Sequence, residues 1–153
     1  MPPDARPPLA VLFACGLNSV RSPMAAALFG QIFGRAVYVG SAGVRKGELD
    51  PFAVAAMTEI GIDISRHKPL TFEELDEWEG LNFDLIVTLA PEAHHRALEL
   101  TRTSAVDVEY WPTADPKAVE GSREQCLDAY REVRDQLLAR IRQRFITRGP
   151  GNE

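Results

Sequence analysis

Several residue types that many protein classes require are scarce in this chain of 153 residues. It has only two cysteines, Cys15 and Cys126, which lie far apart in the sequence, so a disulfide framework and a zinc-binding pattern are excluded. The neighbouring histidines His94 and His95 fall on a predicted helix, where adjacent side chains point about 100° apart and are poorly placed to share a metal ion. We therefore expect no metal site.

Hydropathy and charge exclude further classes. No run of about 20 apolar residues is present, so a membrane-spanning helix is not expected. The formal net charge of −5 argues against a protein that binds nucleic acid or a membrane surface. It does not exclude a phosphate site, because exposed charges act over a Debye length of only about 8 Å.

The domain organisation is expected to be simple. Residues 1–8 combine repeated prolines with an early aspartate and no apolar run, which differs from a signal peptide and favours a cytoplasmic protein. No internal repeat or linker interrupts the chain, and its length suits one hydrophobic core. We predict a flexible N-terminus at 1–8, one domain at 9–146 and a flexible tail at 147–153.

Strand-like and helix-like segments alternate along the chain. The predicted strands are residues 9–14, 36–39, 83–90 and 106–110. The predicted helices begin at Pro23, at Pro51 after the cap Asp50, at the capping box of Thr71 and Glu74, at Pro91, and at the capping box of Ser122 and Gln125. This alternation predicts an α/β fold, a three-layer α/β/α sandwich with a four-stranded, parallel, doubly wound sheet.

The most informative segment joins the first predicted strand to the first predicted helix. Cys15 follows an apolar strand, while Ser22 is a good N-cap residue and Pro23 suits the first helical position. Unpaired N–H groups and the helix dipole at such a junction stabilise an anion, including a thiolate, and the planar guanidinium of Arg21 can bind two phosphoryl oxygens. The segment therefore predicts a nucleophilic thiol in an oxyanion site. The alternative is an inert buried Cys15 and a surface Arg21.

Two segments resemble the low-molecular-weight protein tyrosine phosphatase superfamily, which includes thioredoxin-coupled arsenate reductases. The first consists of residues 11–15 together with residues 21–25, and the second is the Asp115-Pro116 pair within residues 111–116. The resemblance as a whole extends over about residues 9–145. In that family the cysteine attacks phosphorus, the arginine binds the transferring group and the Asp-Pro pair supplies a general acid. The resemblance thus implies Cys15, Arg21 and Asp115 as catalytic residues, with no cofactor.

The resemblance also implies roles for the residues between the thiol and the helix. Phosphate or another tetrahedral oxyanion is expected to lie against Gly16, Leu17, Asn18, Ser19, Val20, Arg21 and Ser22. Asn18 is expected to orient the loop, Ser22 to donate a hydrogen bond to the sulfur, and Ser41 to contact Asn18 from the loop after the second strand. If these roles do not apply, Asn18 is an ordinary turn asparagine, Ser22 is an N-cap without a catalytic role and Ser41 is a loop serine.

The pattern of predicted strands gives separate support for one common site. In a doubly wound sheet, ligands bind at the carboxyl ends of the strands, where the strand order reverses. Cys15, Ser41, Ala90 and Asp115 all follow predicted strands. We therefore expect the proposed nucleophile and acid at the same edge of the sheet.

Some positions depart from the family pattern. Leu17 stands where the family has a glycine, with Gly16 one residue earlier, so a positive φ at Leu17 would be strained. Val20 replaces a second cysteine that many relatives carry. Lys117 follows the Asp-Pro pair where the phosphatases tend to have tyrosines, and the segment 45–47 lacks their aromatic wall. Phosphotyrosine specificity is therefore not expected from these positions.

The C-terminal third is more similar to the arsenate reductases, through Trp111 and residues 130–134 in particular. Those enzymes have two further cysteines, which correspond to Ala90 and Ala97, so an internal disulfide relay is impossible here. The helix acid of a potassium site in some reductases corresponds to Ala26.

We therefore predict a phosphomonoester hydrolase that acts through a phosphocysteine intermediate. Its substrate is expected to be a phosphorylated protein or a small phosphomonoester, with no nucleic-acid or membrane partner. The alternatives are an arsenate reductase that uses an external thiol and a catalytically weak phosphate-binding module.

Overall fold

Strands and helices alternate in the computed structural model, which describes residues 10–146. The strands are β1 (Ala10–Cys15), β2 (Tyr38–Gly43), β3 (Leu85–Thr88) and β4 (Asp107–Tyr110). The α-helices are α1 (Arg21–Phe33), α2 (Pro51–Thr58), α3 (Phe72–Glu79), α4 (Pro91–Leu100) and α5 (Arg123–Phe145), and two 3-10 turns are η2 (Gly34–Ala36) and η3 (Pro116–Ala118). The predicted flexible ends, 1–8 and 147–153, lie outside the described residues.

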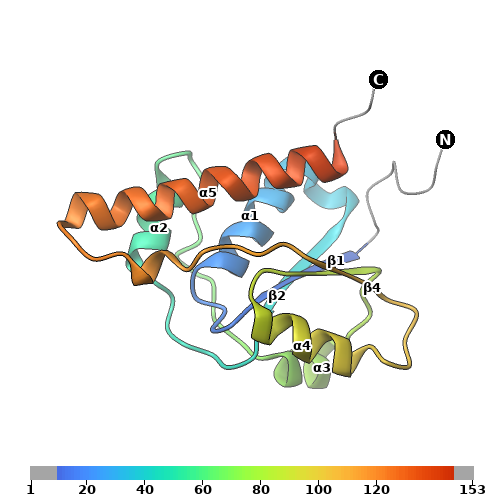
Figure 1. The fold of residues 1–153 in the computed structure, drawn as a ribbon. Coiled ribbons are helices and arrows are strands. Elements are labelled where there is room, and N and C mark those ends of the chain that lie inside the picture. The colour runs from blue at the N-terminus through green and yellow to red at the C-terminus, as the bar shows by residue number, and fades with distance from the viewer. Residues whose placement is uncertain (1–9, 147–153) are drawn as a thin grey trace.

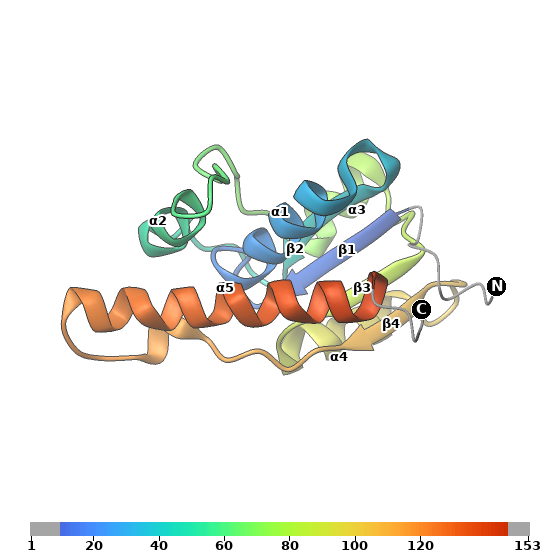
Figure 2. The same cartoon turned by 90° about the horizontal axis from the view of Figure 1, so that it is seen from above.

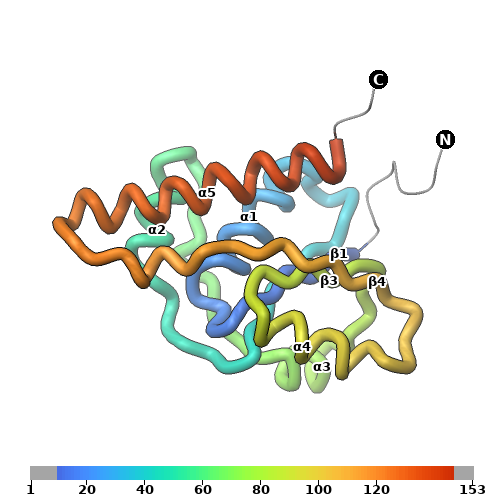
Figure 3. Tube along the Cα trace, viewed as in Figure 1, coloured from blue at the N-terminus to red at the C-terminus, as the bar shows by residue number. Residues whose placement is uncertain are grey.

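The four strands form one sheet in the order β2-β1-β3-β4, and every pairing is parallel. Helices α1, α2 and α5 lie on one side of this sheet and α3 and α4 on the other (Figures 1 and 2). The connection between β4 and α5 runs alongside α5 back to the start of that helix (Figure 3). The predicted three-layer α/β sandwich with a doubly wound sheet is confirmed.

The core is divided by the central strand β1. Val11 and Phe13 pack with α1, α2 and α5, whereas Leu12 and Ala14 pack with α3 and α4. Alternate side chains of a strand point to opposite faces, so a strand covered on both sides must be apolar throughout. Cys15 ends this strand on the α1 side with an exposed fraction of only 2%.

Helix starts follow local sequence signals at four of the five predicted positions, one of which is Pro91, the first residue of α4. The capping boxes of Thr71 with Glu74 and of Ser122 with Gln125 both form, and the Asp50 side chain caps α2. These caps are local because the donor and acceptor lie within three residues of each other.

Two predicted boundaries at the site are wrong. Helix α1 begins at Arg21 rather than Pro23, and Ser22 is not its cap, because the Ser22 hydroxyl contacts the Cys15 sulfur and the Asn18 amide instead. Ser41 does not follow a strand but lies inside β2, paired with Phe13 of β1. Register with β1 sets the bounds of β2, and the η2 turn occupies the start of the predicted strand.

Phe29 lies in the part of the core that faces α1, and its truncation should destabilise the fold strongly. Its ring is fully buried, with its centroid 4.5 Å from that of Phe33 and 5.1 Å from that of Phe145. Replacing a buried phenylalanine with alanine costs about 3–5 kcal/mol, because burial is lost and a cavity remains. We expect Phe29→Ala to lower the free energy of unfolding in urea by that amount. Trp78→Ala is the control: Trp78 is 65% exposed, and an equal loss there would contradict the packing account.

Candidate functional site

The β1–α1 loop (residues 16–20) has its carbonyl groups turned away from the site. The N–H groups of the β2–α2 loop (residues 44–50) donate to the carbonyl oxygens of Cys15, Gly16, Leu17 and Ser19 at 2.9–3.2 Å. Within the described chain, the N–H groups of residues 16–20 have no main-chain acceptor. Because the N–H of a trans peptide points opposite to the carbonyl, these groups are free to face an anion.

Asn18 fixes the backbone of this loop. It is the one non-glycine residue with positive φ, 56°, among residues 10–146, and asparagine tolerates this conformation better than most residues. Its Oδ1 accepts a hydrogen bond from the Leu70 N–H at 3.0 Å and lies 3.1 Å from His67 Nε2. Leu17 does not have a positive φ, so the condition under which it would be strained is not met; the left-handed residue comes one position later. No hydrogen bond joins Ser41 to Asn18 in the described structure, so that expectation is also wrong.

Ser22 links Asn18 to the thiol. The Asn18 amide donates to Ser22 Oγ at 2.8 Å, and the same Oγ lies 3.0 Å from Cys15 Sγ. Because the amide occupies a lone pair of the hydroxyl oxygen, the hydroxyl proton is free to point at the sulfur. A hydrogen bond in that direction stabilises a thiolate.

Arg21 ties the loop to the β4–α5 connection. Its Nη1 donates to the Thr113 carbonyl at 2.8 Å, and its Nη2 lies 3.9 Å from Asp115 Oδ2. Asp115 caps the η3 turn, with Oδ1 accepting from the Lys117 N–H at 3.0 Å. The guanidinium is thus held at the junction of the two segments that carry Cys15 and Asp115.

One cavity of about 110 Å³ brings most of the predicted residues together. Its lining comprises Cys15, Gly16, Leu17, Ser19, Val20, Arg21, Arg45, Glu92, Asp115 and Lys117. Asn18 and Ser22 are fully buried and outside that lining, and Ser41 lines a different hollow with His67. The cavity has room for one tetrahedral oxyanion.

Three charged residues lie at the mouth of this cavity; the sequence pointed to Arg45 and Lys117 only as departures from the family pattern, and it did not point to Glu92. Arg45 and Glu92 form a two-hydrogen-bond ion pair at 2.9 and 3.1 Å, and Lys117 stands beside Asp115. The Glu92 carboxylate comes so close to the backbone that a Cβ atom at Gly16 would clash with it. Arg45 and Glu92 each follow a strand, which is the signal by which they could have been found.

Other chemistry-bearing residues lie outside the cavity. Among residues 10–146, no group of three or more His, Cys, Asp or Glu side chains is placed to hold a metal ion. His94 stacks on Tyr110 and its Nδ1 lies 2.9 Å from Thr88 Oγ1. Both cysteines are free thiols, and Cys126 is partly buried. In the same part of the chain, no helix has the length and apolar character needed to cross a bilayer.

The position of His67 predicts a pH-dependent stability. Burial lowers the pKa of His67 below its usual value near 6.5, against a smaller opposing effect of its hydrogen bond to Asn18. The unfolded chain therefore takes up this proton more readily than the folded one. The stabilisation is complete above about pH 6.5 and is lost as the pH falls towards the pKa of the folded state.

We expect His67→Gln to weaken the fall in unfolding free energy between pH 7 and pH 5.5, as measured by urea denaturation. The same substitution at exposed His95 is the matched control. An equal change in both variants would contradict the assignment to His67.

Comparison with known proteins agrees with this geometry. A family model for low molecular weight phosphotyrosine protein phosphatase matches residues 10–147. An arsenate reductase of Bacillus subtilis (strain 168) is 35% identical over 133 residues, which cover 87% of this chain and 92% of the relative. An arsenate reductase of Brevibacillus brevis is 36% identical over 132 residues, covering 86% and 90% of the two chains.

Solved structures give the same result. A YwlE mutant from Bacillus subtilis has a TM-score of 0.70 and 29% identity, covering 88% of this chain and 95% of that one. An arsenate reductase in the phosphate binding state has a TM-score of 0.71 and 28% identity, covering 88% and 94%. The chain therefore belongs to the low molecular weight phosphotyrosine protein phosphatase family, in the branch that resembles arsenate reductases.

Proposed function

We propose that the protein is a phosphomonoester hydrolase that acts through a phosphocysteine intermediate, with Cys15 as nucleophile, Arg21 as phosphate-binding residue and Asp115 as general acid and base. One observation carries this proposal. Among residues 10–146, no main-chain acceptor binds the N–H groups of the β1–α1 loop, and these groups lie beside a cavity lined by Cys15 and Arg21. Such donors stabilise the charge of a phosphoryl group without reorganising during the reaction.

In the first step, the Cys15 thiolate attacks phosphorus in line with the ester bond. The sulfur–phosphorus bond forms as the bond from phosphorus to the ester oxygen breaks, and Asp115 gives its proton to that oxygen. The loop N–H groups and Arg21 bind the three equatorial oxygens as charge is redistributed. The alcohol or phenol then leaves as a neutral molecule.

In the second step, water attacks the phosphocysteine. Asp115, now a carboxylate, accepts a proton from the water as the sulfur–phosphorus bond breaks, and inorganic phosphate is released. Ser22 supports this step, because its hydroxyl is placed to donate to the departing Cys15 thiolate. Asn18 supports it indirectly by holding Ser22 and the loop backbone.

The residues at the mouth of the cavity bear on the substrate. Arg45, Glu92 and Lys117 are all charged, and none of the described residues that line the cavity is aromatic. A phenyl ring would find no stacking partner there, which favours a phosphorylated protein or a polar phosphomonoester over selection of an isolated aryl group.

Hydrolysis of p-nitrophenyl phosphate in mildly acidic buffer tests the proposal. We expect turnover that inorganic phosphate inhibits competitively, since both ligands would occupy the loop. Phosphate-dependent thermal stabilisation without any turnover of phosphomonoesters would contradict the proposal and favour a phosphate-binding module.

Arsenate reduction is the second candidate, favoured by the similarity to arsenate reductases. Ala90 and Ala97 carry no thiol, so an external thiol would have to attack the sulfur of Cys15 after that sulfur has bonded to arsenate. The sulfur–sulfur bond of a mixed disulfide then forms as the sulfur–arsenic bond breaks. The electron pair of the broken bond stays on arsenic, which is reduced from the +5 to the +3 state and leaves as arsenite. Arsenate-dependent consumption of glutathione or mycothiol supports this candidate, and no consumption with any thiol excludes it.

A further inference from the structure

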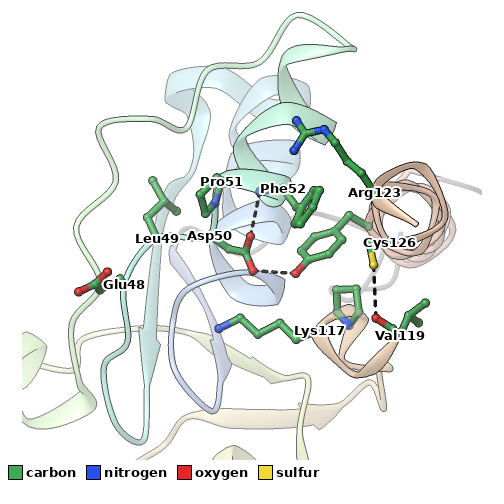
Figure 4. Close-up of a pocket in the computed structure, with 11 residues that line it drawn as sticks. Glu48, Leu49, Asp50, Pro51, Phe52, Lys117, Val119, Arg123 and Cys126 are labelled. Carbon is green, nitrogen blue, oxygen red and sulfur yellow. Dashed lines mark hydrogen bonds between the residues drawn. The ribbon is translucent and has the colours of Figure 1, made fainter. Parts of the chain in front are cut away.

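A second hollow, larger than the phosphate cavity, lies on the other side of the η3 turn. We call it the η3 groove; it has a volume of about 550 Å³ and lies between the start of α2, the η3 turn and the start of α5 (Figure 4). Its lining comprises Glu48, Leu49, Asp50, Pro51, Phe52, Pro116, Lys117, Val119, Arg123, Cys126 and Tyr130. Apart from Lys117, none of these residues lines the phosphate cavity.

The η3 groove adjoins the phosphate cavity at two places. Lys117 lines both hollows, and Pro116 directly follows Asp115. At the floor of the groove, the Asp50 N–H donates to the Ser19 carbonyl of the β1–α1 loop at 3.2 Å. A substrate with its phosphoryl group on that loop would therefore have its remaining atoms within reach of the groove.

The groove walls are apolar and carry positive charge at their rim. Leu49, Phe52 and Val119 contribute apolar surface, and Val119 is 43% exposed. The guanidinium carbon of Arg123 lies over the Phe52 ring, 5.3 Å from its centroid, and both Arg123 and Lys117 are exposed residues. Exposed apolar surface beside two cations suits a ligand that combines an apolar group with a carboxylate.

The acidic residues of the lining lie away from the exposed cations. The Asp50 carboxylate is buried and already accepts hydrogen bonds from the Phe52 N–H at 2.8 Å and the Tyr130 hydroxyl at 2.7 Å. Figure 4 shows Glu48 at the end of the groove farthest from α5, with its carboxylate directed away from the other lining residues. Among the lining residues, Lys117 and Arg123 are therefore the charged side chains that lie exposed beside the apolar surface of Phe52 and Val119.

We propose that the η3 groove binds the residues that flank the phosphorylated side chain of a protein substrate, an apolar residue followed by an acidic one. This inference rests on the proposed hydrolase function and adds to it the class of substrate. The apolar side chain lies against Phe52 and Val119, and the carboxylate pairs with Arg123 or Lys117. The chain as a whole carries a net charge of −5, so this preference comes from the local pair of cations and not from the overall field.

A pair of peptides tests the preference. The first is Glu-Leu-phosphotyrosine-Leu-Glu, and the second is Lys-Ser-phosphotyrosine-Ser-Lys. Both peptides have the same residues on either side of the phosphotyrosine, so the direction in which a peptide binds does not affect the comparison. We expect kcat/KM to be about tenfold higher for the first peptide, because the cations at the rim repel the lysines of the second.

Arg123→Glu should remove most of this preference. Arg35→Glu makes the same charge change at an exposed site in η2 and should keep it. A native ratio near one, or equal ratios in the two variants, would overturn the proposal.

A second experiment does not depend on turnover. In Cys15→Ser, the one remaining cysteine is Cys126, whose thiol lines the η3 groove. We expect the first peptide to slow modification of Cys126 by 4,4′-dithiodipyridine about fivefold or more, whereas inorganic phosphate leaves the rate unchanged. No slowing by the peptide, or equal slowing by phosphate alone, would overturn the groove assignment. If the native protein hydrolyses no phosphomonoester and the peptide still protects Cys126, the proposed function is contradicted and the groove assignment stays supported.

Discussion

Cys15→Ser should lower kcat for p-nitrophenyl phosphate by about 10⁴-fold or more, because a serine hydroxyl is not ionised in mildly acidic buffer and cannot replace the thiolate. The Ser22 hydroxyl that faces Sγ in the native protein, at 3.0 Å, would face a neutral oxygen in the variant. The N–H groups of the β1–α1 loop and the Arg21 guanidinium remain in place. The variant therefore loses chemistry and keeps its anion site.

Binding of phosphate separates these two effects. We expect inorganic phosphate to raise the thermal midpoint of Cys15→Ser about as much as that of the native protein, because the groups proposed to bind it are unchanged. Steady-state hydrolysis and thermal unfolding should be measured on the same preparation, so that a folding defect is detected. Activity within tenfold of the native value, in a variant confirmed by mass spectrometry, would contradict the assignment of Cys15 as nucleophile.

Asp115→Asn should lower kcat by about 10²–10³-fold for phosphate esters of poorly acidic alcohols and far less for p-nitrophenyl phosphate. A good leaving group departs without a proton, so only poor leaving groups need the general acid. The asparagine Oδ1 can still accept the hydrogen bond from the Lys117 N–H, which preserves the cap of the η3 turn. The substitution thus removes the proton and retains the local structure.

A series of phenyl phosphates with leaving groups of graded acidity is the appropriate measurement. In the variant, kcat should depend steeply on the acidity of the leaving group, and in the native protein weakly. Asp107→Asn, at an exposed residue of β4, is the matched control and should behave as the native protein does. Equal slowing of all esters by Asp115→Asn would contradict its role as the acid.

The sequence predicted the features of the fold that depend on local chemistry. The hydrogen bonds of the capping boxes at Thr71 and Ser122 join residues within one helical turn, so these residues alone indicate where α3 and α5 begin. The apolar run that ends at Cys15 indicates a strand covered on both faces. Features that depend on a distant partner were less predictable. The Ser22 hydroxyl contacts Cys15 and Asn18, and no local pattern distinguishes that arrangement from an ordinary N-cap.

The contact between Arg45 and Glu92 was not predicted, because it depends on strand order. Arg45 follows β2 and Glu92 follows β3, and they meet across the site because β1 lies between those two strands. Alternation of strands and helices predicts a parallel sheet without stating which strands are neighbours. The same limit applies to the β2–α2 loop, whose N–H groups bind the carbonyls of the β1–α1 loop. Together these contacts supply the geometry on which the proposed chemistry depends.

The rate of alkylation of Cys15 by iodoacetate at about pH 6 tests the central claim most directly, because this anionic reagent attacks only thiolates and is drawn to an anion site. The modified residue should be identified by mass spectrometry, so that Cys126 is measured separately. We predict that Cys15 reacts at least about tenfold faster than glutathione under the same conditions, and that inorganic phosphate protects it. A rate no higher than that of glutathione, without protection by phosphate, would contradict an ionised nucleophile in an oxyanion site.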